Sequence, residues 1–287
     1  MAKNKVRVGL IQMKVTLSPE ANLTRAVQKI CEAARKGAQI ISLPELFKTH
    51  YFPQAKNSRH FNLAESVPGP TTNALSQLAH KLKVVIVVPV FEKYSAKVYY
   101  NTAVVINADG KMVGKYRKMH LPNDPYFYEK FYFRNGDLGF KSFKTKFGKV
   151  GVLICWDQWF PEAARLIALS GAQILFYPTA IGCPSATPKQ VQLKEKNAWE
   201  MIQRSHAIAN GIYVAAINRV GREKQLTFWG NSFVAGPFGE TIAQASRNEE
   251  EVLIAKCDLI KINQVRNVWP FLKARRVDAY RNLTAPF

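Results

Sequence analysis

A short apolar run that ends in a cysteine constrains the fold of this chain more than any other segment. Residues 150–154 have the length and the β-branched character of a buried strand. Cys155 follows directly, and Pro161, a residue favoured in the first turn of a helix, opens a helical pattern. A thiol at such a junction can meet helix-terminal amides, which lower a thiol pKa and bind a developing oxyanion. Cys155 is therefore either a nucleophile or a small apolar residue that fills the core.

Elsewhere the chain alternates expected strands with expected amphipathic helices. Apolar runs typical of strands occupy residues 6–12, 40–43, 84–90, 99–106, 112–116, 174–177, 213–217, 232–235 and 252–257. Helical spacing of apolar residues occurs at 21–35, 71–82 and 196–210. Residues 107–110 form a hairpin turn signal, so some strands must pair antiparallel. This order predicts an α/β protein whose sheets are buried under helices.

Composition excludes several other classes of protein. The chain has 287 residues, 47% of them hydrophobic, and can bury a substantial core. Its four cysteines are widely spaced and form no C-x-x-C pair, so neither a metal nor another cofactor is expected. No signal-peptide-like or membrane-length apolar run is present, which predicts a cytoplasmic protein without a membrane partner. The net charge of +21 is scattered without a dense basic tract, so no specific nucleic-acid partner is expected.

Two charged residues stand at the ends of other predicted strands. Glu45 follows the strand at 40–43 through Pro44, and Lys118 follows the strand at 112–116 in a basic run. Taken alone, Glu45 would be a loop or cap carboxylate and Lys118 one surface cation. A thiol nucleophile often uses a histidine base, but the five histidines have no telling neighbourhood. They are His50, His60, His80, His120 and His206.

Together, three segments resemble the nitrilase superfamily of carbon–nitrogen hydrolases, whose catalytic residues are glutamate, lysine and cysteine in that order. The matching segments are 43–47 (LPELF), 116–122 (YRKMHLP) and 154–157 (ICWD). The resemblance implies a four-layer αββα sandwich that assembles into dimers or larger homo-oligomers. We expect one domain over residues 1–287, with a C-terminal tail at about 258–287 used in oligomer contacts.

The resemblance also implies the roles of the motif residues. Cys155 would be the nucleophile, and Glu45 would act first as general base and then as general acid. Lys118, with the backbone N–H of Trp156, would stabilise the tetrahedral oxyanion. Glu129 is implied as a second acid that positions Lys118 or the hydrolytic water. From the sequence alone, a plain ion pair of Glu129 with Lys118 or Arg134 is an equal alternative.

The substrate is expected to be a small amide or ureido compound with an aliphatic or cationic tail. Relatives that bind N-carbamoyl amino acids tend to carry arginine shortly after the nucleophile, where this chain has Asp157, Gln158 and Trp159. Aromatic side chains suit a cationic tail, so Tyr51, Trp156 and Trp159 are expected to bind substrate, although core packing is the simpler role for Trp159. The first expected reaction is hydrolysis of N-carbamoylputrescine to putrescine, carbon dioxide and ammonia.

One position speaks against that substrate. Pro184 stands where the resemblance implies a glutamate for the terminal amine, and the first acid downstream is Glu195. Asp124 is our candidate for the missing carboxylate, and the nearby Cys183 is expected to be inert. N-carbamoyl-β-alanine and ω-amides are the alternative substrates. A catalytically silent relative and a polyanion-binding protein are the alternatives from other classes.

Overall fold

Two six-stranded sheets pack face to face in the computed structural model, which describes residues 4–285. The first sheet has the order β17 (Glu251–Asp258), β1 (Lys5–Gln12), β2 (Ile40–Ser42), β3 (Val85–Ser95), β4 (Val98–Ile106) and β5 (Met112–Arg117). The second has the order β16 (Thr241–Gln244), β15 (Phe233–Ala235), β12 (Tyr213–Ile217), β10 (Ile174–Pro178), β9 (Gly148–Val152) and β8 (Ser142–Thr145). Parallel strands lie at the centre of each sheet and antiparallel strands at its edges.

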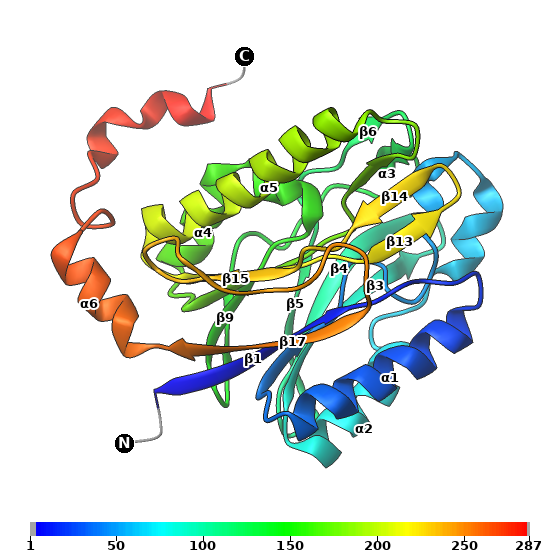
Figure 1. Cartoon of the computed structure of the whole chain (residues 1–287), viewed down its shortest axis with the longest axis horizontal. Coiled ribbons are helices and arrows are strands. Elements are labelled where there is room, and N and C mark those ends of the chain that lie inside the picture. Colours follow the sequence, from blue (N-terminus) through cyan, green and yellow to red (C-terminus); the bar gives the residue numbers. More distant parts are fainter. Residues whose placement is uncertain (1–3, 286–287) are drawn as a thin grey trace.

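Helices cover the outer face of each sheet (Figure 1). Helices α1 (Pro19–Arg35) and α2 (Pro70–Leu82) pack on the first sheet, and α4 (Pro161–Leu169) and α5 (Lys189–Asn210) pack on the second. The strands are apolar on both faces because one face meets a helix layer and the other meets the opposite sheet. The four-layer αββα sandwich predicted from the motif resemblance is thereby confirmed.

The largest apolar cluster fills the space between the two sheets. It joins Val8 and Leu10 of β1 to Val152 of β9 and Phe176 of β10, and all four are fully buried. A second cluster lies under α1 and α2 and includes Ile30 and Ile86. The two sheets are therefore fixed to one another by a continuous core of interlocking side chains.

Several short elements escaped the sequence analysis because they lack a clear period. A three-stranded sheet has the order β11 (Gly182–Pro184), β14 (Leu226–Trp229) and β13 (Val220–Glu223), and none of these strands was expected. The pair β6 (Asn123–Asp124) and β7 (Phe127–Tyr128) leads into the short helix α3 (Glu129–Tyr132). Helix α5 begins at Lys189, directly after Pro188, rather than at residue 196.

The C-terminal segment leaves the body of the sandwich. Helix α6 (Ile260–Val268) is held by the buried side chains of Ile262 and Val265, and the chain beyond it extends outward with two short 3-10 turns (Figure 1). Several large apolar side chains of this segment are exposed: Val268, Trp269, Phe271, Val277 and Leu283. Between residues 4 and 285, no helix combines the length and the apolar character needed to cross a membrane.

Candidate active site

The three motif residues meet where strands of the two sheets end. Glu45 follows β2 and Lys118 follows β5, both in the first sheet, whereas Cys155 follows β9 in the second sheet and opens the 3-10 helix η3 (Cys155–Trp159). Glu45 and Lys118 are almost completely buried, and 6% of Cys155 is exposed. Residues far apart in the sequence are thus brought together in a site with little access for water.

Lys118 connects two buried carboxylates. Its Nζ lies 2.8 Å from Glu45 Oε1, and 2.9 and 2.7 Å from Glu129 Oε1 and Oε2. Burial disfavours the ammonium, but the charges of Glu129 and Glu45 outweigh this effect and hold the pKa of Lys118 well above its ordinary value. Lys118 is therefore a permanent positive charge. The sequence left two ion-pair partners open for Glu129, and the structure shows Lys118.

The two carboxylates differ in their remaining partners. Asn101 Nδ2 donates to Glu45 Oε1 at 2.7 Å, and Tyr51 OH donates to Glu129 Oε1 at 2.7 Å. Burial raises the pKa of Glu129, while the Lys118 ammonium lowers it. Glu45 Oε2 is buried and has no hydrogen-bond partner among the described residues. Glu45 thus keeps one oxygen that can accept a proton.

Arg219, in the loop between β12 and β13, fixes the turn that carries Glu45. Its Nη2 donates to the carbonyl oxygens of Glu45 and Leu46 at 2.7 and 2.9 Å, and its Nη1 lies 2.7 Å from Glu223 Oε1. Leu46 has a φ of 48°, a left-handed conformation that needs such support. Glu223 Oε2 accepts from the Tyr51 backbone N–H at 2.6 Å. One buried ion pair therefore positions both Glu45 and Tyr51.

Cys155 has an unusual backbone and a protonated thiol. Its φ is 44°, a strained value that turns the chain sharply out of the sheet. Burial raises the pKa of the Cys155 thiol well above its ordinary value, and the Glu45 carboxylate raises it further, while Lys118 opposes both. The Trp156 N–H lies in the first turn of η3, where a helix supplies no acceptor of its own.

Asp157 fixes the loop that carries Cys155 and was missed as a functional residue. Its Oδ2 accepts from the Ile154 N–H and from Tyr116 OH, both at 2.8 Å. Its Oδ1 accepts from the His120 N–H at 3.0 Å and lies 2.7 Å from His120 Nδ1. The His120 ring stacks on Phe160 with centroids 3.7 Å apart. Asp157 thus ties the end of β5 to the end of β9.

Replacing Asp157 by asparagine is expected to destabilise the protein and to lower kcat. The asparagine side chain would offer one acceptor oxygen in place of two and would turn an NH₂ group toward existing donors. We expect a loss of about 2–3 kcal/mol in the free energy of unfolding, measured in urea. Asp109→Asn, in the exposed hairpin turn, is the control and should change stability by less than about 0.5 kcal/mol. A D157N variant as stable as the wild type would contradict the role of this carboxylate.

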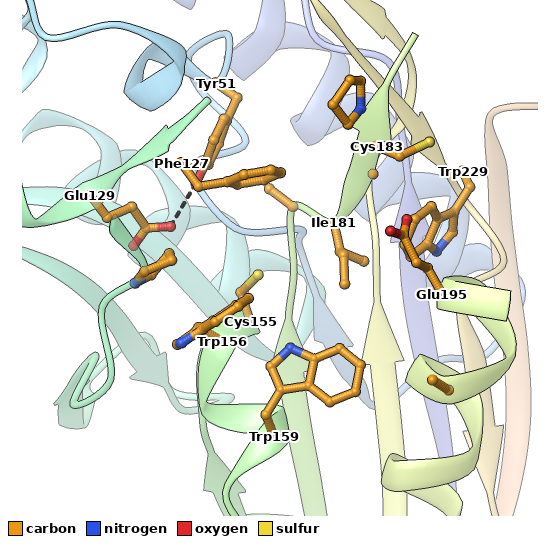
Figure 2. Close-up of a pocket in the computed structure, with 15 residues that line it drawn as sticks. Tyr51, Phe127, Glu129, Cys155, Trp156, Trp159, Ile181, Cys183, Glu195 and Trp229 are labelled. Carbon is orange, nitrogen blue, oxygen red and sulfur yellow. Dashed lines mark hydrogen bonds between the residues drawn. The ribbon is translucent and has the colours of Figure 1, made fainter. Parts of the chain in front are cut away.

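A cavity of about 370 Å³ opens beside Cys155 (Figure 2). Its wall is mainly apolar and aromatic: Tyr51, Pro122, Phe127, Glu129, Cys155, Trp156, Trp159, Ala180, Ile181, Gly182, Cys183, Pro184, Glu195, Ala198 and Trp229. The wall contains two carboxylates, and no lysine, arginine or histidine of the described chain contributes to it. Tyr51, Trp156 and Trp159, which we expected to bind substrate, all lie on this wall.

Asp124 does not occupy the place that we expected. It lies on the exposed two-residue strand β6 and is not part of the cavity wall. Glu195 lines the cavity instead, from α5. A signal for this was present, because Glu195 and the buried Trp199 are spaced i, i+4 and share one helix face. Within residues 4–285, no group of three or more His, Cys, Asp or Glu side chains could hold a metal ion.

Comparison with known proteins establishes the class. Residues 7–267 match the protein family described as carbon-nitrogen hydrolase, so the chain belongs to that family and is an amidohydrolase. The resemblance predicted from the three motifs is confirmed. The chain is 44% identical to the N-carbamoylputrescine amidase of Solanum lycopersicum in an alignment that covers 98% of this chain and 96% of the relative. It is 38% identical to a citrullinase of Francisella tularensis subsp. tularensis, over 98% of this chain and 99% of the relative.

A solved structure supports the same assignment. The crystal structure of a carbon-nitrogen hydrolase from Helicobacter pylori G27 is similar with a TM-score of 0.94 and 43% sequence identity. The match covers 97% of this chain and 98% of the other. The fold and its family are thus established over nearly the whole chain.

Proposed function

We propose that this protein hydrolyses N-carbamoylputrescine, with Cys155 as the nucleophile. One observation carries the proposal. The buried cluster of Lys118, Glu45 and Glu129 stands behind a thiol at the wall of an apolar cavity that presents carboxylates and no cation. A ureido carbon at Cys155 would leave an aliphatic, cationic tail in that cavity. The similarity to plant N-carbamoylputrescine amidases supports this substrate.

The first half-reaction requires a protonated thiol to become a nucleophile. As Cys155 Sγ attacks the ureido carbon, its proton passes to Glu45, whose Oε2 is free to accept it. The carbonyl oxygen becomes an oxyanion, which the Lys118 ammonium and the Trp156 N–H stabilise. Glu45 then returns the proton to the terminal nitrogen, the carbon–nitrogen bond breaks, and ammonia leaves. The enzyme now holds the carbamoyl group as a thioester.

The second half-reaction releases this thioester. Glu45 takes a proton from water, the hydroxyl attacks the thioester carbon, and the proton returns to Sγ as the carbon–sulfur bond breaks. The product carbamate loses carbon dioxide to give the free amine. Glu129 positions the Lys118 ammonium throughout, because both of its oxygens lie within 2.9 Å of Nζ.

The cavity wall disfavours substrates with an anionic tail. N-carbamoyl-β-alanine and N-carbamoyl amino acids carry a carboxylate, which needs a positive partner once it leaves water. The wall supplies none, and Glu195 would repel the carboxylate. ω-Amides of dicarboxylic acids carry a carboxylate at the other end and meet the same objection, whereas simple neutral amides fit the apolar wall but leave Glu195 without a role.

Ammonia release across a substrate panel tests the proposal. We expect kcat/KM for N-carbamoylputrescine to exceed that for N-carbamoyl-β-alanine, N-carbamoyl-D-amino acids, citrulline and ω-amides by at least about tenfold, because each competitor lacks the isolated cationic tail. A preference for any carboxylate-bearing compound would overturn the assignment.

The exposed C-terminal segment supports the expected homo-oligomer. Val268, Val277 and Leu283 are each about two-thirds exposed, which is a large apolar surface for one short segment. We propose that this tail, at about 258–287, contacts a second copy of the chain. A monomeric mass by light scattering would contradict this. The cytoplasmic location stays a prediction.

A further inference from the structure

We propose that Glu195 binds the terminal ammonium of the substrate and thereby selects ureido compounds with a cationic tail. This inference rests on the proposed function and assigns the specificity of the same cavity. Pro184, where the sequence led us to expect an amine-binding glutamate, also lines the cavity but carries no charge. A carboxylate from helix α5 would supply the charge that this position lacks.

Glu195 lies across the cavity from the reacting groups. Figure 2 shows Glu129 and Glu195 on opposite sides of the cavity, with Cys155 and Ile181 between them. Glu129 is engaged by Lys118 and Tyr51 and belongs to the reacting end. Glu195 is thus the one charged group of the described wall that lies at the far end.

Within the described part of the chain, the carboxylate of Glu195 is free to bind a ligand. No hydrogen bond or ion pair of the Glu195 carboxylate occurs among residues 4–285, although the chain carries 41 lysines and arginines. Its neighbour Lys196 pairs with Glu200 at 3.1 Å instead. The pKa of the Cys183 thiol, which also lines the cavity, is raised mainly by burial. The negative charge of Glu195 raises it further, so this charge is felt inside the cavity. Glu195 is exposed, so water solvates its carboxylate in the free protein, and the carboxylate is available to pair with a substrate ammonium that enters the cavity.

Aromatic side chains share the cavity wall with Glu195. Trp159, Trp229 and Phe127 line the cavity together with Glu195. Aromatic faces attract cations and pack against methylene groups, so such a wall suits an aliphatic chain that ends in an ammonium. Six bonds separate the carbonyl carbon of N-carbamoylputrescine from its terminal nitrogen, which is about 7 Å in an extended chain. A small cavity beside Cys155 can span that length.

The test replaces Glu195 by glutamine, which keeps the shape and removes the charge. Two substrates are compared: N-carbamoylputrescine and n-pentylurea, in which a methyl group replaces the ammonium. For E195Q we expect KM for N-carbamoylputrescine to rise about tenfold, with kcat within about threefold of the wild type. KM for n-pentylurea should stay unchanged. The rise is limited to about tenfold because Glu195 is exposed to water, which screens its charge.

Matched variants separate this effect from a general loss of surface charge. Glu200→Gln removes a carboxylate from the same helix outside the cavity wall and should leave both KM values unchanged. Asp124→Asn tests the rival carboxylate. An unchanged KM ratio in E195Q, or a rise in D124N instead, would overturn this inference alone. Wild-type protein that hydrolyses neither ureido compound would overturn the proposed function and the inference with it.

Discussion

Replacement of Cys155 by alanine is expected to abolish turnover while the fold stays intact. Without the thiol no thioester can form, and the loss of a nucleophile in comparable hydrolytic machinery reduces kcat by at least about 10³-fold. The change removes one sulfur atom from a site that is already 6% exposed, so the free energy of unfolding should fall by less than about 1.5 kcal/mol. Ammonia release and urea unfolding measure the two effects separately.

A second buried thiol provides the control for this experiment. Cys257 lies on β17, is fully buried, and is not part of the cavity wall. Cys257→Ala should lose stability like C155A and keep its turnover. A thiol-reactive substrate analogue should label the wild type at Cys155 and fail to label C155A there. Wild-type activity in C155A would exclude the proposed mechanism.

Replacement of Lys118 by methionine is expected to cause the largest loss of stability and also to abolish turnover. The variant leaves Glu45 and Glu129 buried next to each other without a cation. We expect the free energy of unfolding to fall by about 3–5 kcal/mol near pH 7. Loss of the oxyanion partner should reduce kcat by about 10²–10³-fold in addition.

The stability loss of K118M should depend on pH in a defined direction. Burial raises the pKa of Glu129, and in the wild type Lys118 works against this shift. Without Lys118 the folded-state pKa of Glu129 rises further above its unfolded value. A carboxyl group whose pKa is raised on folding contributes stability at low pH and loses it as the pH rises through the folded-state pKa. The wild-type pKa of Glu129 is already raised to about 7, so the deficit relative to the wild type should grow as the pH rises above about 7.

The control for K118M lies on β5, the strand that leads into Lys118. Lys115 Nζ lies 2.5 Å from Glu92 Oε1, but its side chain is 26% exposed and Arg117 Nη2 also binds that oxygen, at 2.8 Å. Lys115→Met should cost less than about 1 kcal/mol and show little pH dependence. Equal pH profiles for the two variants would show that the Lys118 cluster is not the source of the effect.

The sequence was sufficient for the layers of the fold and for the residues at three strand ends. Buried strands appear as continuous apolar runs and helices as amphipathic spacing, so the order of elements is visible without coordinates. The motifs around Glu45, Lys118 and Cys155 then indicated the family. Apolar spacing and short motifs each involve residues that are close together in the chain, so they can be recognised in a single sequence.

Contacts between distant segments were beyond the reach of the sequence. Arg219 supports the Glu45 turn across 174 positions of the chain, and no local pattern marks it as a partner. In the sequence, Asp157 was considered only because it stands where some relatives carry arginine. Its hydrogen-bond partners Tyr116 and His120 lie at the end of a different strand, β5, which the sequence does not place next to it. The wrong expectation for Asp124 also has a long-range cause. Glu195 reaches the cavity wall only because α5 packs on the second sheet, and the sequence does not show this packing.

The two sheets each contribute residues to the active site, and this affects the catalytic rate. Glu45 and Lys118 are attached to one sheet and Cys155 to the other, so the distance over which the thiol proton travels depends on how closely the sheets approach. The distance between the two sheets is set by buried side chains such as Leu10 and Val152, which do not line the cavity. Natural variation in the interior of the sandwich can thus tune the speed of proton transfer while leaving substrate recognition unaltered.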